Sequence, residues 1–245
     1  MVTVTSIPQV EVFPLVPGVA LSVEISRAGA PARSQAVEDA WSKLVAGNPR
    51  LFDGPLLSVL SLGPASAEHP TNEVTVRRDR FSRLAVQPGV RTGVRILSVT
   101  GVLMSTDGAG KRHVLLGRRG SGTRIYDGMW ELGPSGGLQE PPPAVAALDE
   151  GAVFSHLADE VSEEVGLHIE QGRAVCVVRD HFAMSDDLVF VCEVGPLERV
   201  RAAPANWEYS ETAWVAVDEV PAFERAHGAE VIAPTRGIFR AFGWV

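Results

Sequence analysis

Runs of apolar side chains, several of them alternating with polar ones, predict a series of short β-strands. These runs lie at residues 9–25, 56–60, 72–78, 94–104, 113–116, 129–132, 174–178, 188–194 and 213–217. A helix is expected behind Ser34, which suits an N-cap, and Gly47-Asn48-Pro49 ends it. Another short helix is expected at 236–242. Because strands and helices mix along the chain, the pattern predicts an α/β fold with a sheet packed between helices.

The segment before Gly166 is predicted to be an amphipathic helix. Its apolar positions are spaced to share one face: Phe154, Leu157, Ala158, Val161 and Val165. Glu160, Glu163 and Glu164 stand at i, i+3 and i+4, which brings their carboxylates onto another face. Like charges at this spacing repel one another. The helix therefore has one side for a core and one side that suits cations.

Carboxylate oxygens that converge on a helix suit a hard divalent ion such as Mg²⁺ or Mn²⁺. An acidic helix face is also often nothing more than solvated surface, and the helix alone does not decide between the two. The strand expected at 129–132 runs into a glycine-rich turn at 133–138, which lets exposed main-chain groups lie close to the carboxylates. This order of elements favours metal binding.

The composition of the 245 residues is that of a globular protein, with 45% apolar and 21% charged residues. Its net charge of −8 argues against sequence-independent binding to nucleic acid, which needs a basic surface. No apolar run approaches the roughly 20 residues of a membrane-spanning helix, and the N-terminus lacks a secretory signal, so we expect a cytoplasmic protein. Cys176 and Cys192 lie in apolar runs and are expected to be buried, reduced thiols.

From about residue 94 to 243, the order of these parts resembles the Nudix hydrolase family. Residues 160–167 match the second half of the family signature, 128–132 resemble the strand before it, and 212–215 are similar to a late strand with a tryptophan. The resemblance implies an α/β/α sandwich with a mixed sheet. It also implies an enzyme that uses Mg²⁺, or Mn²⁺, to cleave a diphosphate joined to another group.

Two departures from the signature lie ahead of residue 160. The family arginine is Asp159 here, which adds negative charge beside the glutamates. The family glutamate and glycine would fall at Gly151 and Val145, because an insertion of about eight residues separates the glycine-rich turn from the helix. Glu150 lies one residue from the expected glutamate, and its role stays open.

The N-terminal third makes the resemblance more specific. Residues 39–44 and 48–55 are similar to the region ahead of the signature in the Nudix branch that hydrolyses UDP-glucose and UDP-galactose. That branch also lacks the signature arginine and has an extended loop. Together with a change of composition near Pro88-Gly89, this predicts a small α+β N-terminal domain at 1–90 and a Nudix domain at 91–245.

The resemblance assigns catalytic and metal-binding roles to individual residues. The metal ion is expected at the main chain of Gly136 and at the carboxylates of Glu160, Glu163 and Glu164. Glu160 is one candidate for the base that activates water. The other candidate lies before the late strand, where Glu208 and Glu211 are both available and Glu211 is assigned.

Several further polar residues are candidates for substrate contacts. Arg118 and Arg119 follow a strand and are expected to pair with phosphate. Tyr126 is a candidate for stacking on a nucleobase. Asp186 and Asp187 fall in an expected hairpin loop, where they are interpreted as solvated turn residues.

Three functions are compatible with the sequence. The first is hydrolysis of a nucleoside diphosphate sugar of the UDP-glucose or UDP-galactose type to a nucleoside monophosphate and a sugar 1-phosphate. The second is a binding module that has lost hydrolysis through the insertion and Asp159. The third is a pyrophosphatase for another substrate, such as ADP-ribose or a dinucleoside polyphosphate. Each implies a small nucleoside diphosphate derivative as the partner, and a homodimer is possible.

Overall fold

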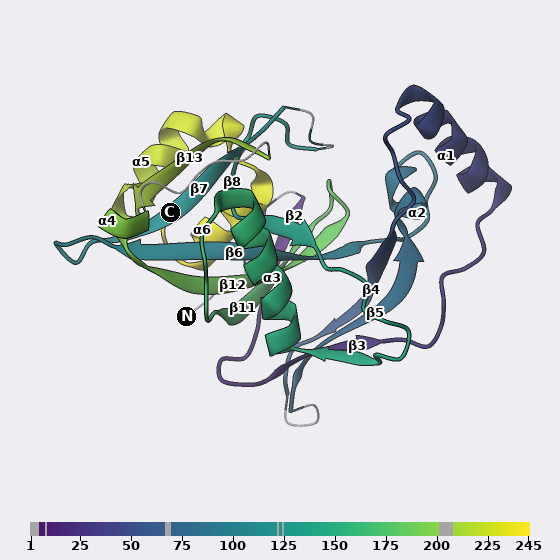
Figure 1. Cartoon of the computed structure of the whole chain (residues 1–245), viewed down its shortest axis with the longest axis horizontal. Helices are drawn as coiled ribbons and strands as arrows, with labels where there is room; N and C mark the ends of the chain where they lie inside the picture. The colour runs from purple at the N-terminus through teal and green to yellow at the C-terminus, as the bar shows by residue number, and fades with distance from the viewer. Residues whose placement is uncertain (1–4, 8, 67–69, 122, 124, 201–207) are drawn as a thin grey trace.

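The computed structural model describes residues 5–7, 9–66, 70–121, 123, 125–200 and 208–245. Within these ranges, thirteen strands join one mixed sheet (Figure 1). The strands are β1 (Thr5–Ile7), β2 (Val10–Pro14), β3 (Leu21–Ile25), β4 (Pro55–Gly63), β5 (Asn72–Arg80), β6 (Ile96–Thr106), β7 (Arg112–Arg119), β8 (Trp130–Leu132), β9 (Ser135–Gly137), β10 (Ala147–Asp149), β11 (Arg173–Asp180), β12 (Ser185–Pro196) and β13 (Tyr209–Ala216). The helices are α1 (Gln35–Gly47), α2 (Phe81–Ala85), α3 (Glu150–Val165), α4 (Leu197–Val200), α5 (Val220–His227) and α6 (Ala233–Ala241).

Strand β6 lies at the centre of this sheet and carries core residues on both of its faces. It pairs in parallel with β12 and antiparallel with β4, β7 and β9. Side chains alternate along a strand, so successive residues of β6 enter two different cores. Leu97, Val99 and Leu103 pack in the core beneath α3, whereas Val102 and Met104 pack in the core beneath α6.

The helices close the two faces of the sheet. Leu157 and Val161 of α3 join the first core, and Val220 of α5 with Ile238 and Phe239 of α6 joins the second. Figure 1 shows α3 crossing one face, with α5 and α6 behind the sheet. The predicted α/β class, with a mixed sheet between helices, is confirmed.

The ends of two helices, α1 and α3, follow from local signals. The Oγ of Ser34 accepts a hydrogen bond from Val37 N, and α1 ends at Gly47, as predicted. α3 ends at Val165, where Gly166 adopts a left-handed conformation with φ 66°. That conformation favours glycine, which explains the stop. The start of α3 at Glu150 depends on Asp149, whose side chain accepts from Ala152 N at 2.8 Å.

Strands from both sides of residue 90 pair within the sheet. β2 pairs with β11, β4 meets β6 at Ser58 and Ile96, and β3 pairs with β10 immediately ahead of α3. The main chain therefore ties the N-terminal segment to the rest of the protein at three places. The division into domains at 1–90 and 91–245 stays a prediction.

A single arginine from β5 holds the insertion that precedes α3. The Arg78 guanidinium donates to Oε1 of Glu140 at 2.7 Å and to the carbonyl oxygens of Pro141, Pro142 and Val145 at 2.6, 3.0 and 3.1 Å. Prolines offer no N–H for a sheet ladder, so the insertion cannot continue the sheet through them. Its carbonyls are bonded to the arginine side chain instead.

Cys176 and Cys192 are both free and buried, as the sequence predicts. Burial raises the pKa of each thiol to about 12, which keeps it in the unreactive protonated form. None of the helices in the described ranges has the length and apolar content needed to cross a membrane.

Replacing Arg78 with alanine is expected to lower the free energy of unfolding by about 2 kcal/mol, because it leaves partly buried acceptors without their charged donor. Chemical denaturation followed by circular dichroism measures this change. Arg50→Ala, at an exposed position, is the matched control and should alter stability by less than about 0.5 kcal/mol. Equal stability of the two variants would show that Arg78 does not hold the insertion.

Candidate functional site

Helix α3 presents its glutamates to different surroundings. Glu164 is only 4% exposed and faces the sheet, Glu160 is partly buried, and Glu163 is exposed. The expectation of a single shared acidic face is therefore met by Glu160 and Glu164 but not by Glu163. The physical reason is the 3.6-residue turn of the helix, which puts Glu164 next to the buried stripe of Val161 and Val165.

Glu160 lies directly against the glycine-rich strand β9. A Cβ atom built at Gly136 would lie 2.5 Å from the carboxyl carbon of Glu160, so a side chain at this position would have to displace the end of the Glu160 side chain. His156, one turn earlier on α3, places Nε2 2.9 Å from the carbonyl oxygen of Gly137 and 3.3 Å from Oε1 of Glu160. The glycine predicted for the metal site is thus brought to the carboxylate.

A second buried carboxylate comes from the strand ahead of β9. Glu131 is 3% exposed, receives a hydrogen bond from Arg119 Nη1 at 2.6 Å, and receives another from the Tyr209 hydroxyl at 3.0 Å. Burial raises the pKa of Glu131, while the charge and hydrogen bonds of these two partners oppose the shift. Sequence reasoning missed Glu131, and the only local signal was its place in the strand entering the glycine-rich turn.

The carboxylates around α3 crowd one another. Burial, followed by the charges of Glu208, Glu160 and Glu131, raises the pKa of Glu164 to about 9. Burial is also the main cause that raises the pKa of Glu160. The Glu160 and Glu164 carboxyl groups share a hydrogen bond, so a proton holds the pair together without a cation.

The donor chemistry of this cluster fits a hard divalent ion. Carboxylate oxygens of Glu160 and Glu164 and the main chain of Gly136 are oxygen donors of the kind that Mg²⁺ prefers, and their mutual repulsion favours a cation. Among the described residues, however, no three His, Cys, Asp or Glu side chains are already arranged around a common point. Glu163 is exposed, and its charge acts on the pKa of Glu160.

The two arginines that were predicted to bind phosphate, Arg118 and Arg119, lie on opposite faces of the sheet because they are neighbours on a strand. Arg119 pairs with Glu131 and lines the cavity described below, and its buried Nε has no hydrogen-bond partner among the described residues. Arg118 lies on the opposite face, where it bonds the carbonyl of Gly128 and pairs with Glu230. Its Nη1 is also 3.9 Å from Glu211.

The two candidates for a base, expected before the late strand, also separate, because β13 begins at Tyr209 and includes Glu211. Glu211 is exposed and lies beside Arg118 on the far face of β7. Glu208 acts on the pKa of Glu164, Glu160 and Glu131, which places its charge near the α3 carboxylates. Of the two, Glu208 is the one that the structure brings to the cluster. Glu150 lies elsewhere, accepting a hydrogen bond from Ala174 N at 3.0 Å.

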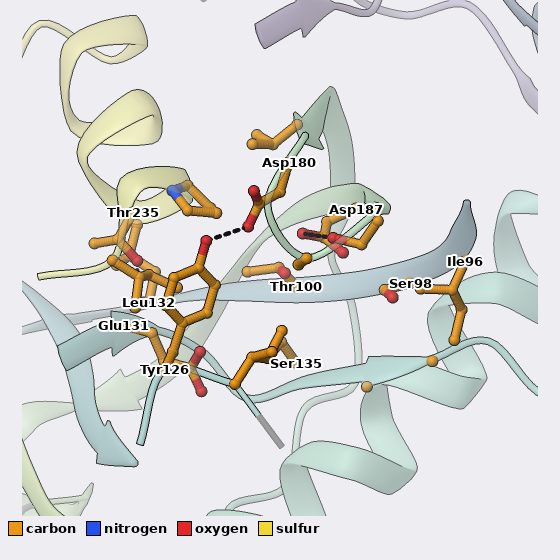
Figure 2. A pocket seen from close by; sticks show the side chains of 18 of the residues that line it. Ile96, Ser98, Thr100, Tyr126, Glu131, Leu132, Ser135, Asp180, Asp187 and Thr235 are labelled. Carbon is orange, nitrogen blue, oxygen red and sulfur yellow. Dashed lines mark hydrogen bonds between the residues drawn. The ribbon is translucent and has the colours of Figure 1, made fainter. Parts of the chain in front are cut away.

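A cavity of about 210 Å³ adjoins the cluster, with Gly136 and Glu131 in its wall. Figure 2 shows Tyr126 reaching across it to Asp180, with Asp187 and Thr100 beyond. The Tyr126 hydroxyl donates to Oδ2 of Asp180. Tyr126 therefore links the loop after β7 to the hairpin between β11 and β12.

The interpretation of Asp186 and Asp187 as solvated turn residues is wrong. Both belong to β12, because the hairpin turns earlier than the sequence suggested. Asp186 is fully buried and pairs with Arg95 and Arg179. Asp187 lines the cavity, where burial, followed by the charges of Asp180 and Asp186, raises its pKa to about 8.

Comparison with known proteins gives likenesses in structure only. No family model matches the sequence, and no curated protein matches it. The structure resembles DR0079 from Deinococcus radiodurans, with 15% identity and a TM-score of 0.48 over 77% of this chain and 99% of that chain. It also resembles the MutT protein from Methanosarcina mazei Go1, with 22% identity and a TM-score of 0.44 over 61% of this chain and 93% of that chain.

A third solved structure with a similar arrangement is RenU, a Nudix hydrolase from M. smegmatis. It shares 15% identity and a TM-score of 0.41 over 61% of this chain and 84% of that chain. Identities and scores of this size assign no activity. The function proposed below therefore rests on the residues of this chain.

The raised pKa of Glu164 predicts that a divalent cation stabilises the protein more strongly at high pH. The unfolded chain releases this proton near the ordinary pKa of 4.5, whereas the folded protein holds it to about pH 9. The free energy of unfolding without metal therefore falls as pH rises between these values. A bound cation replaces the proton, so Mg²⁺ should raise the melting temperature by more at pH 8.5 than at pH 6.

Thermal unfolding with Mg²⁺ or with a chelator measures this effect, and each 1 kcal/mol corresponds to roughly 2–4 °C in a chain of this size. Glu164→Gln should flatten the pH dependence and remove most of the Mg²⁺ effect. Glu170→Gln, an exposed glutamate beyond α3, should behave as the unmodified protein. A Mg²⁺ effect that is equal at both pH values would contradict the assignment.

Proposed function

We propose that this protein is a metal-dependent hydrolase of the Nudix type. Its reaction is cleavage of the diphosphate bond in a nucleoside diphosphate sugar of the UDP-glucose or UDP-galactose type, which gives a nucleoside monophosphate and a sugar 1-phosphate. The observation that carries the proposal is the packing of Glu160, hydrogen-bonded to Glu164, against Gly136 in the wall of a cavity.

The crowding of carboxylates at Glu160 and Glu164 destabilises the folded protein unless a cation binds between them. Burying several carboxylates together raises their pKa values and weakens the folded state near neutral pH. A structural helix would bury apolar residues at these positions instead. Glu160, Glu164 and the main chain of Gly136 would hold Mg²⁺, and Glu163 is proposed as a further ligand. The bound ion neutralises the diphosphate and makes the attacking water more acidic.

The remaining chemistry falls to side chains around the cluster. Glu160 is the first candidate for the general base, because its raised pKa lies closer to neutral pH than that of an ordinary carboxylate. Glu208 is the second, and its charge lies nearer the cluster than that of Glu211. Arg119, with a buried Nε that lacks a partner among the described residues, is the candidate for contact with the substrate.

The N-terminal segment supports the choice of a nucleotide sugar. Its sequence at 39–44 and 48–55 carries the resemblance to the UDP-sugar branch. The short helix α2, which follows in the same segment, contributes Phe81 and Leu84 to the wall of the cavity. The segment therefore shapes the space in which the substrate is selected.

Incubation with a panel of diphosphates in the presence of Mg²⁺ tests the proposal directly. UDP-glucose, UDP-galactose, ADP-ribose and a dinucleoside polyphosphate are compared, and the monophosphate products are separated and quantified. We expect the highest kcat/KM for a UDP-sugar. A preference for ADP-ribose would support the proposed enzyme class but contradict the proposed substrate. Binding of UDP-sugars without turnover would identify a binding module.

Glu164→Gln is expected to reduce kcat/KM by at least about 100-fold, because changes around metal ligands already cost 10–100-fold and this change removes a ligand. Steady-state kinetics measure the loss, and circular dichroism verifies folding. Glu170→Gln is the matched control and should retain full activity. Activity of Glu164→Gln near the unmodified level would exclude Glu164 as a ligand.

A further inference from the structure

The cavity beside the carboxylate cluster is too small for a whole nucleotide sugar. Pockets that enclose complete ligands usually span about 300–1,000 Å³. This one is about 210 Å³, enough for a single ring. Ser135, Gly136 and Glu131 belong to its wall, so it adjoins the place where the diphosphate would lie. One end of the substrate must therefore enter the cavity while the phosphates stay outside.

The charge of the cavity decides which kind of group enters. Three carboxylates line it, those of Glu131, Asp180 and Asp187. Arg119 is the one cationic side chain among its described lining residues, and it already pairs with Glu131. A phosphate would meet net repulsion here. A neutral group that donates hydrogen bonds would be attracted.

The hydrogen bonds already present leave Asp187 available. Asp180 is occupied at both oxygens, because Oδ1 accepts from Phe182 N and Oδ2 accepts from Tyr126. Glu131 accepts from the charged Arg119 and from Tyr209, both at Oε1. The partners that the described residues offer Asp187 are hydroxyls, Ser185 at 3.4 Å and Ser98, and a hydroxyl can turn to other acceptors. Asp187 is thus the lining carboxylate that is least fixed by charged or main-chain donors.

Arg119 supplies a second and independent observation. Its Nε is buried and lacks a hydrogen-bond partner among the described residues, although Arg119 is part of the same wall. A ligand group that meets both residues must donate to a carboxylate and accept from a guanidinium. A hydroxyl does both, whereas an ammonium group can only donate.

The rest of the wall suits the face of a ring. Apolar side chains surround the polar groups, among them Ile125, Val178, Ala183, Ile232 and Pro234. A saturated sugar ring has apolar C–H faces and hydroxyls at its edge. Apolar walls with a few convergent polar groups match that distribution.

We propose that the cavity holds the hydroxyl-bearing ring of a sugar, with Asp187 accepting from its vicinal hydroxyls. This inference deepens the proposed function and rests on it for the placement of the diphosphate. Asp187 is then the residue that selects the sugar. Tyr126, held by Asp180, closes the cavity on the side of the loop after β7 (Figure 2).

Binding of small phosphates tests the proposal without requiring turnover. Glucose 1-phosphate, ribose 5-phosphate and ethyl phosphate are titrated calorimetrically into the full chain with Mg²⁺. Ethyl phosphate has no ring, and the two sugars distinguish a glycosyl group from a ribosyl group. We expect the unmodified protein to bind at least one sugar phosphate more tightly than ethyl phosphate.

Asp187→Asn should weaken binding of that sugar phosphate by about 10-fold to 100-fold, because the amide NH2 that replaces one carboxyl oxygen cannot accept from a hydroxyl, and leave ethyl phosphate unchanged. Glu193→Gln, an exposed carboxylate on the same strand, is the matched control. An unchanged ratio between sugar phosphate and ethyl phosphate in Asp187→Asn would overturn the proposal, as would the absence of any preference in the unmodified protein.

A second variant keeps the test decisive if Asp187→Asn does not fold. Ala183 lies in the turn between β11 and β12 and lines the cavity, so Ala183→Leu fills part of the space, and circular dichroism verifies that this variant folds. It should abolish the preference for the sugar. Unaltered sugar binding would place the ring elsewhere. A protein that binds sugar phosphates in this way but hydrolyses no diphosphate would retain this inference and lose the proposed function.

Discussion

The close approach of α3 to β9 is the contact on which the rest of the site depends. Gly136 leaves room for the carboxylate of Glu160, which a side chain at this position would displace. The same approach removes Glu160 and Glu164 from water and sets them beside Glu131 and Glu208, which raises their pKa values. The packing of α3 against β9 therefore brings together carboxylates whose charges repel one another. A bound cation, as proposed above, would offset the repulsion between these carboxylates.

The sheet carries this contact and the cavity together. β6 pairs with β9 on one side and with β12 on the other, so Gly136 and Asp187 are both positioned by the register of a single strand. The N-terminal segment adds α2 to the cavity and Arg78 to the insertion. The proposed substrate selection and the proposed metal binding thus draw on different parts of the chain around one strand.

Local features of the sequence were enough to predict α1, the end of α3 at Gly166 and most strands, because caps, glycines and alternation act over a few residues. The partners of the site act over long distances and escaped prediction: Glu131 meets Tyr209, and Asp187 lies opposite Tyr126 only once β11 and β12 pair. The placement of Arg118 and Arg119 on opposite faces could have been predicted from the sequence, since neighbouring residues of a strand face opposite sides.

The hydrogen bonds from Arg78 to the insertion before α3 constrain the length of the insertion more than they constrain its amino-acid sequence. Three of its four acceptors are main-chain carbonyls, which every amino acid provides. Residues of the insertion can therefore be substituted without loss of these hydrogen bonds. Adding or deleting a residue would shift the carbonyls out of reach of the guanidinium. The insertion is therefore constrained in length but not in amino-acid composition. Sequence changes that preserve the fold should be substitutions within it, not insertions or deletions.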